Sequence, residues 1–183
     1  MFKRFFVRWF FLTCILSSIS FISYAVALYD LQHSNQYKLL YSDESKDLYM
    51  NLSSVQSLRY NPPYYTLKYQ TYLIDYNDSS ITSSDFIANY NYNNSIEGIA
   101  RSLDVTNLSF DEAKLALKRA KFKNSGITGT YKLNKVYSFD GSVKVDFVTL
   151  DDDIRFEKLD YSYANPFYIG AAYAFEKAYN IVF

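Results

Sequence analysis

The sequence predicts an α+β domain in which helices pack on a single antiparallel β-sheet. Apolar and polar residues alternate with period two through much of residues 37–93 and again through 129–150, as is typical of strands with one buried face. Two helical segments are expected, one inserted between strands at about 109–123 and one at the C-terminal end at about 168–179. Runs of strands interrupted by single helices favour an antiparallel sheet over the regular alternation of a parallel one.

The first three strands are predicted at residues 37–41, 47–55 and 64–75. The third has the clearest alternation, with one face formed by Tyr65, Leu67, Tyr69, Thr71 and Leu73. Between the second and third strands, residues 59–63 are expected to be a connection, because Pro62 and Pro63 cannot donate a hydrogen bond to a neighbouring strand.

A fourth strand is predicted at 81–93, after a polar turn at 77–80. The helix that follows begins at Ser109, whose spacing from Glu112 is that of a capping box, and it carries an alanine-rich apolar stripe. Two more strands, at 129–139 and 142–150, flank the hairpin signal Asp140-Gly141.

The N-terminal residues have the order of a secretory signal peptide. A basic segment, 1–8, is followed by an apolar segment, 9–24, and then by the two small-x-small sites Ser23-Tyr24-Ala25 and Ala25-Val26-Ala27. We expect residues 1–27 to be the signal peptide, with cleavage after Ala27, or after Ala25 as the second choice. Residues 28–183 then form a single domain, because no linker-like or repeated segment divides them.

Two alternatives for the leader compete with cleavage. The apolar run 5–28 is long enough to remain as an uncleaved membrane anchor, if the charge of Arg8 is tolerated. Lipid attachment at Cys14 is disfavoured, because this cysteine lies inside the apolar run and no small residue precedes it. Without a retained leader, no membrane contact is expected.

Charge and cysteine content exclude several classes of function for the mature chain. The three bases of the leader leave 16 basic and 19 acidic residues beyond it, a net charge of about −3. This balance argues against a nucleic-acid partner, since such domains carry an excess of bases. Cys14 is the one cysteine, so the mature domain contains no disulfide, zinc-thiolate site or cysteine nucleophile.

No residue pattern indicates catalysis or a cofactor. His33 is the one histidine and lies in a polar segment just after the leader, where disorder is expected. The acidic run 151–153, with Glu157 nearby, is the best candidate for calcium, but it lacks the glycine that usually makes the turn of such a loop, and a solvated turn is favoured. We therefore expect no metal, no cofactor and no enzymatic activity.

The 20 tyrosines are the remaining candidates for binding. Tyr60, Tyr64 and Tyr65 surround the two prolines, and a second group lies near the C-terminus: Tyr161, Tyr163, Tyr168 and Tyr173. Either group suits an aromatic surface for a glycan or a peptide. The competing explanation is that these rings cover the faces of the sheet, where tyrosine packs well.

Several segments resemble those of known exported proteins. Asp47 to Val55, Tyr60-Asn61-Pro62-Pro63-Tyr64-Tyr65 and Ala172 to Asn180 resemble small exported proteins of unknown function from anaerobic Firmicutes that have an outer membrane. The opening strand is more remotely similar to surface-adhesin protein E-like domains. The resemblance implies a location in the cell envelope and an α+β fold, and it assigns no functional residue.

Three hypotheses for function follow. The first is an exported, non-enzymatic envelope protein of adhesion type that binds an envelope macromolecule or a glycan, in the periplasm, at the cell surface or outside the cell. The second is a secreted hydrolase that uses two carboxylates about 5–10 Å apart. The third is a purely structural envelope component with neither pocket nor exposed aromatic patch.

Overall fold

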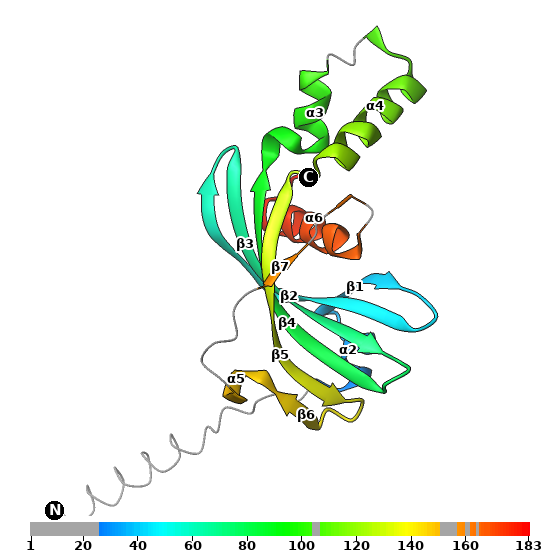
Figure 1. The fold of residues 1–183 in the computed structure, drawn as a ribbon, viewed down its shortest axis with the longest axis vertical. Coiled ribbons are helices and arrows are strands. Elements are labelled where there is room, and N and C mark those ends of the chain that lie inside the picture. Colours follow the sequence, from blue (N-terminus) through cyan, green and yellow to red (C-terminus); the bar gives the residue numbers. More distant parts are fainter. Residues whose placement is uncertain (1–25, 104–106, 151–156, 160–161, 164) are drawn as a thin grey trace, which may run out of the picture.

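The predicted fold class is confirmed by the computed structural model, which describes residues 26–103, 107–150, 157–159, 162–163 and 165–183 (Figure 1). One antiparallel sheet has the strand order β1-β2-β3-β4-β5-β6, and β7 also pairs with β5. The described elements are α2 (Leu28–His33), β1 (Tyr37–Ser42), β2 (Lys46–Asn61), β3 (Tyr64–Asp75), β4 (Ser80–Asn91), the short 3-10 helix η1 (Tyr92–Asn94), α3 (Ile96–Ser102), α4 (Phe110–Lys123), β5 (Ile127–Ser138), β6 (Val143–Asp146), α5 (Phe147–Leu150), β7 (Glu157–Leu159) and α6 (Pro166–Tyr179).

Local signals set most of these boundaries. The Ser109–Glu112 capping box starts α4 as predicted, with the Glu112 carboxylate accepting hydrogen bonds from the backbone nitrogen (2.9 Å) and Oγ (2.7 Å) of Ser109. Gly141 closes the β5–β6 hairpin with a φ of 89°, a left-handed conformation that glycine adopts without strain. Strand β3 has the predicted bounds, and Asp75 accepts backbone hydrogen bonds that shape the turn after it.

Four local predictions are wrong. The connection predicted at 59–63 is reduced to Pro62 and Pro63, because Tyr60 pairs with Tyr65 and Asn61 with Tyr64, which extends β2 to Asn61. The strand predicted at 142–150 ends at Asp146, whose carboxylate accepts a hydrogen bond from the nitrogen of Val148 and begins α5.

The other two corrections concern helices. The segment around His33 is not disordered. It is the helix α2, held by Leu31, which is 1% exposed. Helix α3 precedes α4 and is not predicted from the sequence, so two α-helices rather than one are inserted between β4 and β5.

The strands are covered on one face of the sheet along one half of their length and on the opposite face along the other half. In β3, the odd-numbered Tyr65, Leu67 and Tyr69 belong to a core cluster with α6, whereas the even-numbered Tyr72 and Ile74 belong to a second cluster with α2. Successive residues of a strand point to opposite faces, and β3 pairs with β4 without a bulge, so the two clusters must lie on opposite faces. We call these the α6 face and the α2 face.

The position of α6 depends on a close approach to the sheet. Gly170 lies where a Cβ atom would come within 3.0 Å of Leu40 Cδ1, and Ala171, Ala174 and Phe175 are completely buried beside it. Small residues on this side of the helix bring its backbone near the strands. The opposite side of α6 therefore remains available to line a surface.

Candidate functional site

A pocket of about 290 Å³ lies beside α6 and next to α3 and the last residues of the chain. Its lining is aromatic and aliphatic except for one carboxylate: Ile96, Tyr163, Tyr168, Ile169, Ala172, Tyr173, Glu176, Val182 and Phe183. Its volume lies just below the range of about 300–1,000 Å³ for drug-sized ligands, so it suits a single side chain or one sugar ring.

Helical periodicity explains how α6 lines the pocket and packs on the sheet at the same time. The α6 residues at the pocket are spaced alternately by one and three positions, so that every second one is four positions further on: Tyr168, Ile169, Ala172, Tyr173 and Glu176. Such spacing gathers side chains on one side of a helix. Asn165 begins the helix by accepting a hydrogen bond from the nitrogen of Phe167 at 2.9 Å, and Pro166 occupies its first turn.

The floor of the pocket is held by the C-terminal phenylalanine. The Phe183 ring is 2% exposed and packs on Tyr90 and Phe175, with ring centroids 5.3 and 5.2 Å away. A backbone oxygen of Phe183 also accepts a hydrogen bond from the nitrogen of Ile96 at 3.3 Å. These contacts join the end of the chain to the start of α3, so both contribute walls to one pocket.

A buried lysine lies against two of these walls. Lys121 is only 2% exposed. Its Nζ lies 4.4 Å from the ring centroid of Phe183 and 5.3 Å from that of Tyr168. Nζ donates a hydrogen bond to the Ser125 carbonyl at 3.0 Å, and burial lowers the pKa of Lys121 to about 8. The two aromatic faces favour the ammonium form and so oppose part of the decrease in pKa that desolvation causes.

The charges around the pocket disfavour a cationic ligand. Lys121 lies against Tyr168 and Phe183, and Lys38 Nζ lies 5.8 Å from the ring centroid of Tyr173. Glu176 provides the one acidic side chain of the lining. A ligand that presents an uncharged apolar surface therefore fits these walls best.

The rim of the pocket is also apolar. Ile96, Ile169, Ile181 and Val182 are 42%, 45%, 41% and 61% exposed. The first two and Val182 also line the pocket, and Ile181 precedes Val182 in the chain. Contiguous exposed apolar residues around a cavity are typical of surfaces that bind another molecule.

The predicted patch of Tyr60, Tyr64 and Tyr65 is divided between the two faces of the sheet. Tyr65 is buried on the α6 face against Phe175, and Tyr60 covers it with ring centroids 5.4 Å apart. Tyr64 is the next residue to Tyr65 in β3, so it points to the other face, where the Arg59 guanidinium lies 5.9 Å from its ring centroid. The three rings do not form one surface.

The second tyrosine group is partly brought together. Tyr163, Tyr168 and Tyr173 all line the pocket, and the rings of Tyr163 and Tyr168 are 5.2 Å apart. Tyr161 lies outside the described residues, as does the acidic run 151–153. The spacing within α6 was the available signal for the pocket, because residues 168, 172, 173 and 176 share one side of the predicted helix.

A hydrolase of the two-carboxylate type needs two acidic side chains, and the lining of this pocket contains one. Glu176 is the carboxylate of the pocket lining, whereas Asp85 pairs with Lys68 at 3.0 Å and Asp146 pairs with Lys135 at 2.8 Å. Within the part of the chain that the structure describes, no group of three histidine, cysteine, aspartate or glutamate residues is placed to hold a metal ion.

The leader sites fall at the boundary of the described residues. Ala25 lies outside them, and Ala27 is the N-cap of α2. Val26 is 5% exposed and belongs to the core cluster of the α2 face. None of the helices among the described residues has the length and apolarity needed to cross a membrane.

Comparison of the chain with protein-family models, curated proteins and solved structures gives no match.

Proposed function

We propose that this chain is an exported cell-envelope protein that binds a protein partner, with an apolar side chain of the partner seated in the pocket beside α6. The observation that carries the proposal is the combination of an aromatic pocket with an exposed aliphatic rim. Protein interfaces place their strongest contacts in this way, with a buried side chain at the centre and water-excluding apolar residues around it. The leader and the resemblance to exported proteins support the location.

The lining favours a protein partner over a glycan. A buried sugar ring presents many hydroxyl groups, and each one that lacks a hydrogen-bond partner weakens binding. The walls offer the Glu176 carboxylate and the hydroxyls of Tyr163, Tyr168 and Tyr173, but every other lining side chain is apolar. An aliphatic or aromatic side chain has no such requirement.

The polar side chains on the sheet face opposite α6 are a weaker candidate surface. Thr66 donates a hydrogen bond to Asn89 at 2.8 Å, and Asp85 is bound by both Lys68 and Asn134. Because these groups already satisfy one another, a ligand would have to replace existing hydrogen bonds there. The pocket requires no such replacement.

A photo-crosslinking experiment in the native host tests the proposal. A photo-reactive amino acid replaces Ile169 at the pocket rim, and the control replaces Leu39 on β1, since the two residues are 45% and 43% exposed. We expect a defined polypeptide adduct from position 169 and none from position 39. A second change, Ala172→Phe, projects a ring into the pocket and should abolish the adduct, with circular dichroism as the check on folding.

The other hypotheses give different outcomes. Adducts of equal yield at both positions, or an adduct that is unaffected by Ala172→Phe, would contradict a role for the pocket. An envelope polysaccharide that binds the purified protein and is blocked by Ala172→Phe would replace the protein partner with a glycan. Export is tested separately by locating the protein in cell fractions, and a cytoplasmic location would remove that part of the proposal alone.

A further inference from the structure

A second surface lies on the helical arm formed by α3 and α4, which projects from one end of the sheet (Figure 1). The two helices pack on each other, and α3 also contacts η1 at the end of β4. Along α4, the half-buried residues Ala113, Ala116, Leu117 and Ala120 lie on one side of the helix, and the other side is exposed. The exposed side is the outer face of the arm.

The outer face combines apolar and basic side chains. Leu115 and Phe122 are 48% and 54% exposed and lie about two turns apart, on the same side of α4. Exposed bases flank this pair on both sides: Lys114, Lys118, Arg119 and Lys123. Lys118 Nζ lies 5.8 Å from the ring centroid of Phe122, so one flank contacts the apolar pair directly.

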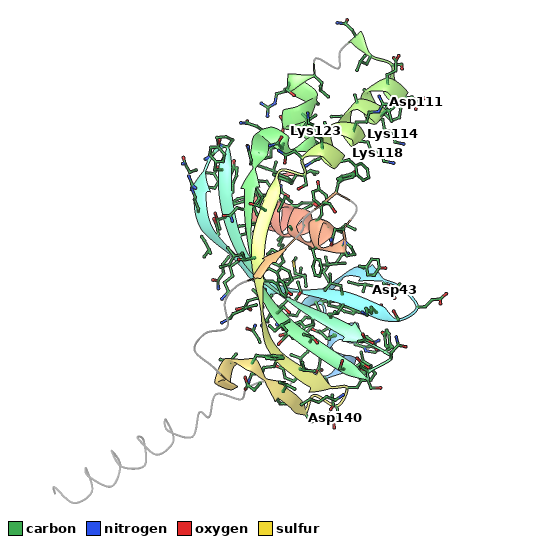
Figure 2. The ribbon with its side chains drawn as sticks, in the orientation of Figure 1. Asp43, Asp111, Lys114, Lys118, Lys123 and Asp140 are labelled. Carbon is green, nitrogen blue, oxygen red and sulfur yellow. The ribbon has the colours of Figure 1, made fainter. Side chains whose placement is uncertain are left out.

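The charge of this segment differs from that of the remaining chain. Residues 113–123 contain five bases and no acid, whereas the rest of the chain from Val26 onward contains 11 bases and 19 acids. Figure 2 shows Lys114, Lys118 and Lys123 on the arm, whereas Asp140 lies at the far end of the sheet and Asp43 at the side of the molecule, both away from the arm. Lys121 is buried, so four of these five bases are at the surface. An anionic surface would therefore attract this face of α4 and repel the body of the domain.

The tip of the arm exposes large apolar residues. Phe110 is 82% exposed at the start of α4, and Leu103 and Leu108 on either side of the α3–α4 connection are 43% and 41% exposed. A soluble polyanion would be recognised by the bases alone and would leave these apolar residues without a partner. Exposed leucine and phenylalanine beside lysines are typical of segments that lie in a membrane interface, with the apolar side chains below the headgroups.

The geometry points to the α3–α4 arm as a docking surface for membranes with anionic headgroups. Phe110 and Leu115 enter the interface, and the flanking lysines contact the headgroups. The Phe122 ring packs on Tyr163, with ring centroids 5.4 Å apart, at the base of this surface. Asp111 lies on the same exposed side, near the tip, and opposes this attraction, whereas Glu112 is held in the capping box by Ser109. The inference does not rest on the pocket, whose proposed partner is a protein.

Vesicle sedimentation with the chain from Val26 onward tests this inference. Both core clusters consist of residues from Val26 onward, so this chain retains the described core, and circular dichroism checks its folding. The probes are vesicles of phosphatidylcholine alone and vesicles with 30% phosphatidylglycerol. We expect binding to the anionic vesicles, weakened by salt, and little binding to the neutral ones.

Matched variants assign the binding to the arm. The double variant Lys114→Gln/Lys118→Gln should weaken partitioning about 30-fold, as expected for the loss of two surface lysines. The control Lys144→Gln/Lys177→Gln changes the net charge equally and should leave partitioning unchanged. Asp111→Asn should strengthen partitioning about 5-fold, since it removes a repelled charge.

The apolar contribution needs its own pair of variants. Phe110→Ser should weaken partitioning about 10-fold, whereas Tyr29→Ser, which removes a ring that is 69% exposed far from the arm, should have no effect. Equal loss in the control variants, equal binding to neutral vesicles, or no binding to anionic vesicles would overturn the inference. So would unchanged partitioning of Phe110→Ser together with binding to polyglutamate, which would indicate an acidic polymer instead of a membrane.

Discussion

Replacing Lys121 with methionine should change how the stability of the domain depends on pH. Lys121 is 2% exposed, and burial lowers its pKa from 10.5 to about 8. Between these values the unfolded chain binds a proton that the folded chain does not, so the free energy of unfolding rises with pH in this window. Methionine removes the titrating group while keeping an unbranched side chain of similar length.

The size of the effect follows from the two pKa values. Each unit of difference corresponds to about 1.4 kcal/mol, and most of the window lies between pH 7.5 and pH 10. From pH 7.5 to pH 10, the free energy of unfolding of the wild-type domain should therefore rise by about 2 kcal/mol relative to that of Lys121→Met. The rings of Phe183 and Tyr168 favour the ammonium form, which makes this figure an upper value.

Urea unfolding of both proteins at pH 7.5, 8.5, 9.5 and 10 measures the difference. Ionisation of the tyrosines above pH 9 affects both proteins alike and cancels in the comparison. Lys118→Met is the matched control for the change from lysine to methionine, since Lys118 is an exposed lysine of the same helix. The two proteins are compared by the difference between their free energies of unfolding. If this difference stays constant within about 0.5 kcal/mol over the pH range, the argument that the buried ammonium is destabilising is refuted.

Three further outcomes test other parts of the structure. Phe183→Ala should lower the free energy of unfolding by about 3–5 kcal/mol, because it empties the floor of the pocket, whereas Val182→Ala, at a residue 61% exposed, should change it little in the same urea titration. Gly98→Ala should lower the free energy of unfolding by about 1–3 kcal/mol, since the new Cβ atom would meet two backbone oxygens at 2.5 and 2.6 Å. If the variant is instead more stable by about 1 kcal/mol, as expected for alanine in an open helix, α3 is packed differently. The mass of the native protein should correspond to a start at Val26, which is 5% exposed in the core, rather than at Leu28; a start at Leu28 would mean that Val26 is dispensable, and a full-length mass would mean that the leader is retained.

The features predicted from the sequence depend on interactions within a few residues. The alternation of β3, the capping box of Ser109 and Glu112 and the hairpin at Gly141 each need only neighbouring side chains and backbone groups, so they were predicted correctly. Helix α3 follows a similar local signal, since Ser95 accepts a hydrogen bond from the nitrogen of Gly98. It was missed because Gly98 lowers helix propensity, although this glycine is required by the close backbone oxygens of Tyr92 and Asn93.

The sequence by itself therefore determined the class of fold, the approximate positions of β1 to β6 along the chain and the two main helices. Tertiary structure decided which face of each strand is buried, because α6 and α2 cover opposite faces of the same sheet. It also divided Tyr64 from Tyr65 and brought Lys121, Tyr168 and Phe183 together around the pocket. These outcomes depend on packing between residues that are distant in sequence, and burial is a property of the whole fold rather than of a local pattern.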